Sequence, residues 1–251
     1  MRYFYIEELL QTGSVKRMTG PDVKHIRNVL RCKPGDHLMV LNGEGFEYEA
    51  DIVEITSTHV DVAIGNKKPS TAESPVDITI AQAFLKERKM DALVRPLTEL
   101  GIKRWVPFFS ERSVPKPDGK RLVLRTERWR KIARESLKQC KRGRLPEISD
   151  TGSYGDMLQL CRHHDIKLIL WENESVPLQH VLPQTQPNNV TDICVVLGPE
   201  GGFTEKEIKK AEAYGFASAG LGPRIMRAET AAIAAGALIQ YLFGDLGQKR
   251  A

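Results

Sequence analysis

Apolar and polar positions along the chain follow two different patterns, which change near residue 70. In the first part, short apolar stretches alternate with polar residues, a pattern that predicts half-buried strands over 37–41, 46–50 and 60–64. The dipeptide Asn42-Gly43 predicts a β-hairpin between the first two of these stretches. One helix is expected over Asp22–Arg31. Residues 1–70 are therefore predicted to form a small β-rich domain.

The second part alternates strands with amphipathic helices. A polar stretch over 66–75 precedes it and is interpreted as an interdomain linker. Strands are expected over 77–84, 104–108, 167–171, 192–197 and 217–221, and helices over 89–100, 126–140, 205–214 and 231–243. This alternation predicts an α/β domain with a mostly parallel sheet over residues 76–246. Pro96 indicates that the first of these helices either bends near Ala92 or begins after residue 89.

Composition is that of an ordinary globular protein, with 41% hydrophobic and 27% charged residues among 251. The longest apolar stretch, 231–243, is shorter than the roughly 18 residues that span a bilayer, and no signal-peptide pattern opens the chain. We therefore expect no membrane association.

The four cysteines show no Cys-x-x-Cys spacing, which favours reduced thiols and a cytoplasmic protein. His163 and His164 are interpreted as a solvated loop pair, and no metal site is expected.

Positive charge is concentrated in one segment. Between Lys103 and Arg144 there are fifteen Lys and Arg side chains and only four Asp and Glu, whereas the formal net charge of the whole chain is +5. Such a segment is typical of a protein that binds a polyanion, although a solvated helix face has the same composition. Two expected helices carry a basic outer face, formed by Arg130, Arg134 and Lys138 on one and by Lys24, Arg27 and Arg31 on the other.

Two glycine-rich loops follow apolar strands near the end of the chain, Gly198-Pro199-Glu200-Gly201-Gly202 and the segment 220–230. Because the carboxyl ends of parallel strands meet at one edge of a sheet, the two loops predict a small-molecule cleft there. The chain has no dinucleotide or ATP glycine motif, and Glu200 disfavours a phosphate, so a cationic or hydroxyl-bearing ligand is expected. Thr204 and Glu207 have the spacing of a helix capping box. The alternative is that these glycines serve only tight turns.

The two loops also carry the most specific resemblance in the chain. The stretches 197–203, Leu-Gly-Pro-Glu-Gly-Gly-Phe, and 221–231, Leu-Gly-Pro-Arg-Ile-Met-Arg-Ala-Glu-Thr-Ala, resemble the knotted SPOUT methyltransferases. Within them they are most similar to the RsmE group, which methylates N3 of a uridine in bacterial small-subunit ribosomal RNA. Supporting likenesses over 25–31, 98–101, 109–113 and 144–148 extend the resemblance to nearly the whole chain. It implies a PUA-like RNA-binding β-barrel domain, a trefoil-knotted parallel α/β domain, S-adenosylmethionine as methyl donor, and a homodimer.

The resemblance and the loop chemistry together assign roles to individual residues. The expected cofactor site consists of Leu170, Leu197, Gly198, Glu200, Gly201, Gly202, Leu221, Gly222, Ile225, Met226 and Thr230. Arg227 is expected to stabilise the uracil anion that forms when N3 loses its proton, and Glu229 is the candidate base. A purely structural role, with Glu229 paired to Arg227 or capping the final helix, is the alternative. The expected RNA contacts are Lys24, Arg27, Arg31, Arg112, Arg130, Arg134, Lys138, Arg142 and Arg144.

Two readings of local detail stay open. The family carries a Gln-Cys/Ser-Gly-Arg run where this chain has 139–144, so that either Arg142 or Arg144 corresponds to the family's arginine.

The final helix begins with small residues, which allow close approach of either a second subunit or the chain's own sheet. The resemblance implies the former, with Ala235 on the outward side. Gly202 is expected to lie in the adenosine slot, where a branched side chain would block binding.

The predicted function is therefore a uridine-N3 methyltransferase that acts on small-subunit ribosomal RNA. A SPOUT 2′-O-ribose methyltransferase is one alternative, although the chain has no Asn-x-Gly-x3-Arg run near the start of its second domain. A non-catalytic RNA-binding assembly factor that has kept only the fold is the other.

Overall fold

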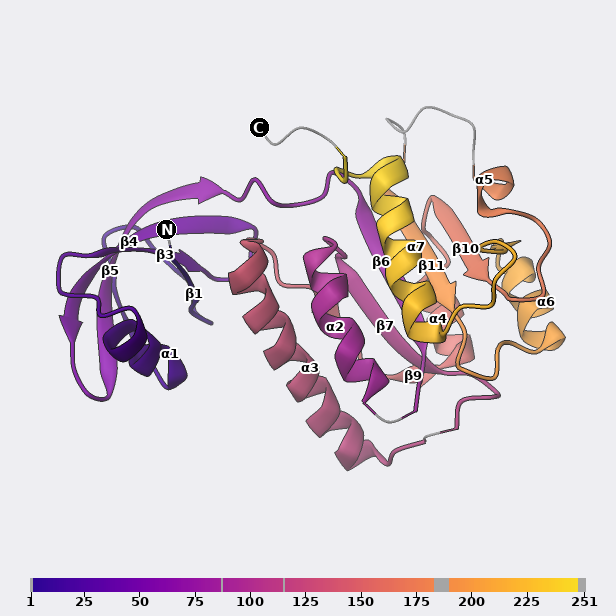
Figure 1. The fold of residues 1–251 in the computed structure, drawn as a ribbon, viewed down its shortest axis with the longest axis horizontal. Helices are drawn as coiled ribbons and strands as arrows, with labels where there is room; N and C mark the ends of the chain where they lie inside the picture. Colours follow the sequence, from indigo (N-terminus) through magenta and orange to yellow (C-terminus); the bar gives the residue numbers. More distant parts are fainter. Residues whose placement is uncertain (1, 87, 115, 183–189, 248–251) are drawn as a thin grey trace. The chain divides into compact units, whose positions relative to one another are not determined.

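A computed structural model describes residues 2–86, 88–114, 116–182 and 190–247. Two compact units are present (Figure 1). One contains Met1–Glu73 together with Arg134–Leu145, and the other contains Ser74–Ala133 together with Pro146–Ala251. The N-terminal unit thus includes a segment from the middle of the chain, which the sequence pattern placed in the second domain.

The N-terminal unit is built on a five-stranded sheet of order β1-β3-β4-β5-β2. Its strands are β1 (Tyr3–Tyr5), β2 (Val15–Thr19), β3 (His37–Leu41), β4 (Phe46–Ile55) and β5 (His59–Pro69). All neighbouring strands pair antiparallel except β1 and β3, which are parallel. The expected hairpin is confirmed as β3 and β4. Strand β5 continues to Pro69 and so occupies part of the predicted linker, because its pairing with β4 extends to the Phe46–Pro69 pair.

The expected helix over Asp22–Arg31 is shorter and less regular than predicted. It consists of α1 (Pro21–Lys24) and a π-helical turn, η1 (His25–Val29). The wider turn is visible in the hydrogen bond from the Leu30 N–H to the His25 carbonyl oxygen, 2.9 Å long. Val23 and Ile26 are nevertheless buried in the core of the unit, as the apolar spacing predicts. Arg31 then adopts the left-handed backbone conformation, with φ 54°, and ends the helix.

The C-terminal unit contains a seven-stranded sheet of order β12-β10-β11-β6-β7-β8, with β9 paired to β7. All its pairs are parallel. The strands are β6 (Asp77–Ala83), β7 (Arg104–Phe109), β8 (Glu147–Ile148), β9 (Gly152–Ser153), β10 (Ile166–Leu170), β11 (Asp192–Leu197) and β12 (Ala217–Ala219). The helices are α2 (Lys89–Glu99), α3 (Gly119–Cys140), α4 (Tyr154–Leu160), α5 (Leu178–Val181), α6 (Glu205–Ala213) and α7 (Ala228–Phe243).

Helices cover the sheet in layers, as expected for a parallel α/β domain (Figure 1). Helices α4 and α6 bury Met157, Leu158 and Ile208 against small and β-branched residues of β6 and β11, such as Ala81 and Val196. Helix α7 returns from the edge strand β12 to contact α2, β6 and β11. This long return is the connection at which the resemblance implies a knot, and it brings the start of α7 next to the ends of the central strands.

Several element boundaries differ from the predicted ones. Helix α3 begins at Gly119 rather than 126, and α7 begins at Ala228 rather than 231. Helix α2 begins at Lys89 with Pro96 inside it, so the alternative of a later start is wrong. Helix α4 was not predicted, although Ser153 and Asp156 form a complete capping box at its start.

One histidine of the expected solvated pair is buried. His164 is 7% exposed, whereas His163 is exposed. The His164 ring contacts the Cys161 carbonyl oxygen through Nδ1 at 3.0 Å and the Thr79 hydroxyl through Nε2 at 2.9 Å. Cys161 and Cys194 bring their thiols within 4.8 Å of this ring. Cys161 and His164 are three residues apart, a spacing that the sequence reading overlooked. Because both ring nitrogens already have partners within the fold, we assign His164 a structural role.

We predict that His164 makes stability fall on mild acidification. Burial, aided by Arg104, lowers the His164 pKa, against the opposing effect of Asp192. The pKa of His164 is therefore lower in the folded protein than in the unfolded chain, where it is about 6.5. Its contribution to the free energy of unfolding is complete above the unfolded-state pKa and is lost as the pH falls below that value. The thermal midpoint should fall from pH 7.5 to pH 5.5. His164→Asn should lower stability at pH 7.5 by about 1–3 kcal/mol, because buried hydrogen bonds are lost.

The His164→Asn variant should also lose most of the pH dependence between these two values. His163→Asn is the matched control and should keep the wild-type dependence. An unchanged dependence in His164→Asn would show that other groups cause it.

Candidate functional site

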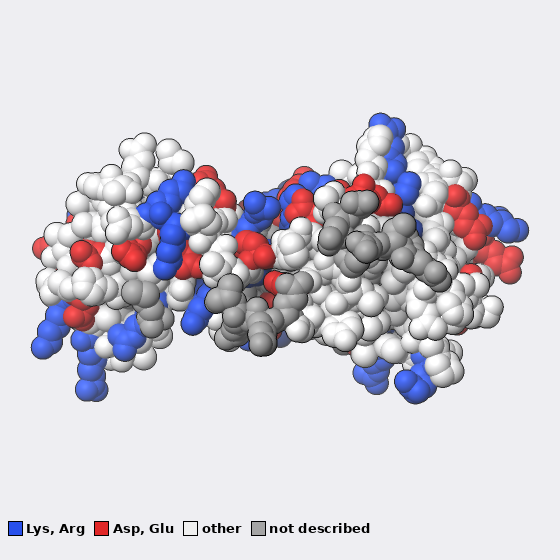
Figure 2. All heavy atoms as spheres, turned by 90° about the horizontal axis from the view of Figure 1, so that it is seen from above, with Lys and Arg blue, Asp and Glu red and all other residues white. Residues whose placement is uncertain are grey.

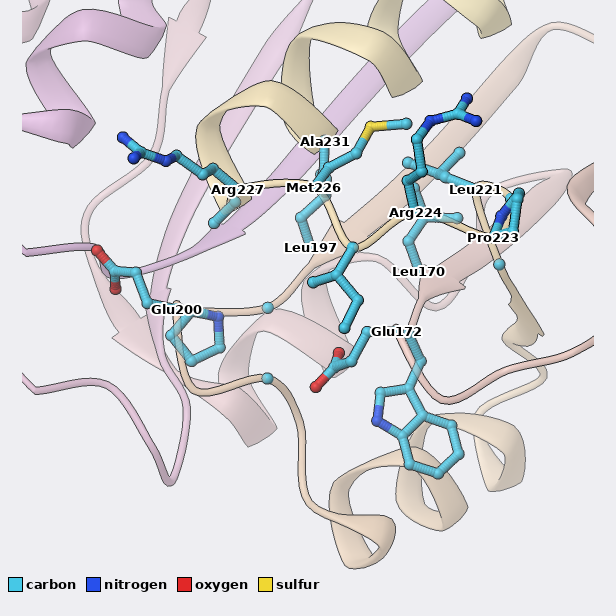
Figure 3. Close-up of a pocket in the computed structure, with 18 of the residues that line it drawn as sticks. Leu170, Glu172, Leu197, Glu200, Leu221, Pro223, Arg224, Met226, Arg227 and Ala231 are labelled. Atoms are coloured by element: carbon cyan, nitrogen blue, oxygen red, sulfur yellow. The ribbon is translucent and has the colours of Figure 1, made fainter.

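A cavity of about 390 Å³ lies at the carboxyl ends of β10, β11 and β12 (Figure 3). Its walls come from the two glycine-rich loops, from the residues that follow β10, and from the first turns of α2 and α7. The lining residues are Lys89, Leu170, Trp171, Glu172, Leu197, Gly198, Pro199, Glu200, Gly202, Gly220, Leu221, Gly222, Pro223, Arg224, Ile225, Met226, Arg227, Ala228 and Ala231. The two loops thus meet at one edge of the sheet and enclose a cleft, as the sequence predicts.

Most of the expected cofactor residues lie in this wall. Those that line the cavity are Leu170, Leu197, Gly198, Glu200, Gly202, Leu221, Gly222, Ile225 and Met226. Gly201 and Thr230 belong to the same loops but are not part of the lining. Nine lining residues had no individual prediction. Five of them belong to the two loops that were predicted to form the cleft, namely Pro199, Gly220, Pro223, Arg224 and Ala228. The other four, Lys89, Trp171, Glu172 and Ala231, lie outside both loops. Trp171 ends the predicted strand 167–171 and Glu172 directly follows it, and this is the one signal that the sequence offers for these two residues.

The first loop is held by side chains from neighbouring elements. The buried Gln82 at the end of β6 donates from its amide to the Gly198 carbonyl oxygen at 3.0 Å. Arg112 donates to the Gly201 carbonyl oxygen at 2.9 Å. Thr204 and Glu207 form the predicted capping box at the start of α6, which is confirmed. The Gln82 and Arg112 side chains and the capping box of α6 all fix the loop. Its backbone is therefore preorganised for a ligand.

An ion-paired cluster joins three elements beside the cavity. Lys89 lies with its Nζ 3.1 Å from the Glu200 carboxylate and 3.5 Å from that of Glu229. Glu200 also accepts a hydrogen bond from the Lys86 N–H at 3.0 Å. Burial acts to raise the pKa of Glu200, but hydrogen bonds from the backbone and from Lys89 outweigh it and lower that pKa. The Glu200 hydrogen bond raises the pKa of Lys89. Glu200 and Lys89 therefore stay charged near neutral pH, and the cluster ties the first loop to α2 and α7.

The two expected catalytic residues are placed differently from each other. Arg227 lines the cavity and is exposed, and its guanidinium makes no hydrogen bond or ion pair with any residue that the structure describes, whereas its backbone carbonyl accepts from the Ala231 N–H at 2.9 Å. Figure 3 shows its guanidinium on the side of the cavity where Glu200 lies. Glu229 is not part of the lining, and its carboxylate pairs with Lys89 rather than with Arg227. A base at Glu229 would first have to give up this ion pair.

Gly202 explains why the expected Val substitution is not a clean test of ligand binding. Its φ of 68° lies in the left-handed region, which disfavours any side chain. A Cβ atom at this position would also lie 1.7 Å from a carboxylate oxygen of Glu172. Gly202→Val would therefore displace Glu172 and strain the loop, whatever binds in the cavity.

The expected RNA-contacting residues fall into two groups. Those with exposed side chains are Lys24, Arg27, Arg31, Arg112, Arg130 and Arg144. Three others have partners inside the N-terminal unit: Arg134 pairs with Glu7, Lys138 with Asp22, and Arg142 with Glu73. Arg142 is 2% exposed, so it cannot present its guanidinium to RNA, and Arg144 is the arginine of this run that can. The prediction of an exposed basic stripe through Arg134 and Lys138 is therefore wrong, because both side chains are used within the fold.

Charge on the face of the molecule seen in Figure 2 is mixed. On the face shown in Figure 2, Lys and Arg side chains lie among Asp and Glu side chains and form no single continuous patch. None of the described helices has the length and apolar character needed to cross a membrane.

Comparison with known proteins gives matches over the whole chain. The profile of the RNA methyltransferase domain matches residues 72–240, and that of the RNA methyltransferase PUA domain matches residues 18–65. Ribosomal RNA small subunit methyltransferase E of Bacillus subtilis is 30% identical over 248 residues, which cover 96% of each chain. The protein of that name from Aquifex aeolicus is 31% identical over 238 residues, covering 93% of this chain and 96% of the relative.

Two solved structures with a bound cofactor are similar over nearly their full length. One is a ribosomal RNA small subunit methyltransferase E from Neisseria gonorrhoeae bound to S-adenosyl methionine, with a TM-score of 0.86, 30% identity, and coverage of 98% of this chain and 99% of that one. The other is a methyltransferase from Legionella pneumophila in complex with the same cofactor, with a TM-score of 0.87, 30% identity, and coverage of 97% and 98%.

Proposed function

Because this chain belongs to the ribosomal RNA small subunit methyltransferase E family, we propose that it transfers a methyl group from S-adenosylmethionine to N3 of a uridine in small-subunit ribosomal RNA. The expected fold, a PUA-like sheet followed by the parallel sheet of a SPOUT domain, is confirmed. The observation that carries the proposal is the cavity between the two glycine-rich loops, in a chain that is similar to cofactor-bound relatives over both units.

The cavity fits the proposed cofactor in size and chemistry. Its volume of about 390 Å³ lies in the range of small-molecule sites, roughly 300–1,000 Å³. Leu170, Leu197 and Met226 offer apolar walls for the adenine ring and for the methylene groups of the methionine part. When bound, S-adenosylmethionine supplies an electrophilic methyl group on a positively charged sulfur. The charge of Glu200 is compatible with that sulfur, but its carboxylate is occupied by Lys89, so we propose that it shapes the loop instead.

Arg227 is the residue that we propose to act on the target base. For N3 to attack the methyl carbon its proton must leave, and this loss puts negative charge on the uracil ring, which a nearby guanidinium would stabilise. The carbon–sulfur bond would then break with its electrons going to sulfur, so that the methylated ring and the sulfur both end uncharged. Arg227 is available for this role because it lines the cavity and its guanidinium has no partner among the described residues. We keep Glu229 only as a candidate acceptor for the proton, since Lys89 holds its carboxylate.

Radiolabelled S-adenosylmethionine and ribosomal RNA that lacks the modification test the proposal. The purified protein should bind the cofactor by calorimetry and transfer label to the small-subunit RNA. An assembly factor that has kept only the fold would bind RNA without transferring label. Transfer to a ribose 2′-oxygen would support the alternative enzyme class.

We predict that RNA binding uses the exposed basic residues of α1 and its continuation. Lys24, Arg27 and Arg31 have exposed side chains and no acidic partner among the described residues. Their joint replacement by Gln should reduce the slope of log affinity against log salt by about 2, since each lost phosphate contact removes about 0.7 for a single strand. Cofactor affinity should be unchanged. The matched control replaces three basic residues that have acidic partners, namely Lys16, Arg17 and Lys68, which pair with Glu8, Asp61 and Glu47 respectively. An unchanged slope in the first variant would remove these residues from the RNA surface.

We propose that the protein is a homodimer that uses the outer face of α7. The expected outward residue, Ala235, is in fact 1% exposed, so that prediction is wrong: the helix packs this side against its own sheet. The exposed apolar residues of this helix are Ile233, Leu238, Tyr241 and Leu242. Ile225, in the cavity wall, is 85% exposed. A partner that covers these side chains would remove apolar surface from water.

We predict that Leu238→Glu converts the dimer to a monomer and lowers methyl transfer at least tenfold. A charge in a desolvated interface is costly, whereas on an open helix face it is not. Light scattering measures the mass, and Lys209→Glu on the exposed side of α6 is the control. A monomeric wild-type protein would exclude the interface outright.

The compartment that we propose is the cytoplasm, where small-subunit ribosomal RNA is available to a modifying enzyme.

A further inference from the structure

The carboxylate of Glu172 lies in the cavity lining, but Glu172 belongs to no sequence motif and has no role in the methyl transfer proposed above. It lies in the connection after β10 and belongs to the cavity lining. Figure 3 shows that its side chain points into the cavity. Its Oε1 atom lies 1.7 Å from the position where a Cβ of Gly202 would be, so the carboxylate rests against the α-carbon of the first glycine-rich loop. Glu172 is exposed and lies between the end of β10 and the loop that follows β11.

The two acidic residues of the cavity lining differ in their partners. Glu200 is occupied by the Lys86 N–H and by Lys89. Glu172 accepts no hydrogen bond and forms no ion pair with any residue in the described ranges of the chain. A carboxylate has about four acceptor positions, and inside a cleft it gains most from a ligand that fills at least two of them. Glu172 is therefore placed to receive hydrogen-bond donors from the ligand.

The position of Glu172 selects among the donors of the proposed cofactor, and this step rests on the proposed function. Arg227 and Glu200 lie together on one side of the cavity, where the methyl group would meet the target base (Figure 3). Glu172 lies away from them in Figure 3, and it directly follows Leu170 and Trp171 in the chain, both of which also line the cavity. Two adjacent hydroxyl groups match the two oxygens of a carboxylate, which is how acidic residues bind ribose at the carboxyl ends of strands in other α/β proteins.

We propose that Glu172 accepts hydrogen bonds from the 2′- and 3′-hydroxyl groups of the cofactor ribose and so determines specificity for an intact ribose. Gly202 is required for this placement. With φ 68° and no side chain it leaves the space that the carboxylate occupies. A substrate analogue without the 2′-hydroxyl loses one of the two donors, and a 2′-phosphate is repelled by the carboxylate.

Calorimetry with three ligands tests the proposal: S-adenosylhomocysteine, 5′-methylthioadenosine, which lacks the amino-acid part, and the 2′-deoxy analogue of the latter. Glu172→Gln should lower the affinities for S-adenosylhomocysteine and for methylthioadenosine by the same factor, about tenfold or more, because a charge-assisted hydrogen bond becomes a neutral one. The wild type should bind the deoxy analogue more weakly than methylthioadenosine, and Glu172→Gln should discriminate far less between them.

Glu174→Gln is the matched control, since Glu174 lies in the same connection outside the cavity lining and accepts from the Val176 N–H at 3.1 Å. It should leave all three affinities unchanged. If Glu172→Gln lowered the affinity for S-adenosylhomocysteine alone, Glu172 would bind the ammonium group of the amino-acid part, and the ribose assignment would be wrong. Unchanged binding of every ligand by Glu172→Gln would remove Glu172 from the site. If the wild type bound none of the three, the proposed function itself would fail.

Discussion

Arg227→Ala is expected to lower the turnover number at least about a hundredfold while it leaves cofactor affinity nearly unchanged. Losing one donor that stabilises charge in a transition state typically has an effect of this size. The guanidinium lines the cavity and is not engaged by any described residue, so its removal breaks no contact of the fold. Single-turnover kinetics give the rate of the chemical step, and calorimetry gives the affinity for S-adenosylmethionine.

Three further variants show what an effect at Arg227 means. Arg227→Lys keeps the charge and should recover part of the rate. Arg224 also lines the cavity but points to the opposite side in Figure 3, and Arg224→Ala should affect turnover much less. Glu229→Gln should lower the rate most near neutral pH, with recovery at higher pH, only if Glu229 takes the proton. Equal losses in Arg227→Ala and Arg224→Ala would contradict a specific role for Arg227.

Ala231→Leu is expected to weaken cofactor binding by a factor of about five to 150 without unfolding the protein. Ala231 lies in the first turns of α7 and lines the cavity, so a larger side chain there takes up ligand space. Overfilling a packed site costs about 1–3 kcal/mol, which corresponds to this range of factors. Leu is a good helix former, so the substitution avoids the backbone strain that a side chain at Gly202 would cause.

Ala213→Leu, on the exposed side of α6, is the matched control. Both variants should keep the wild-type thermal midpoint within a few degrees. If Ala231→Leu bound S-adenosylmethionine with wild-type affinity, the ligand would have to bind outside this cavity.

The sequence predicted the parts of the site that local chemistry determines. Glycine-rich loops after apolar strands, and the Thr204–Glu207 capping box, are local signals, and the structure has the cavity and the box where they indicate. The same signal was present at Ser153 and Asp156, where it marks the start of α4 and was overlooked.

What the sequence could not predict depends on contacts between distant residues. Lys138 looks like a solvent-exposed cation on its helix, but its partner Asp22 lies 116 positions away. His164 looks like a loop residue, yet it contacts Thr79, 85 positions away. Ala235 could face either way on a helix rich in small residues on all sides. Glu172 belongs to no motif, and only the fold brings its carboxylate against Gly202.

Mass spectrometry of nucleosides tests the central claim most directly. Small-subunit ribosomal RNA is isolated from cells that encode this protein and from cells in which its gene has been deleted. The account predicts that 3-methyluridine is present in the first, absent in the second, and restored when the purified protein and S-adenosylmethionine are added to the unmodified small-subunit RNA. Unchanged 3-methyluridine after deletion, or loss of a 2′-O-methylated nucleoside instead, would contradict it.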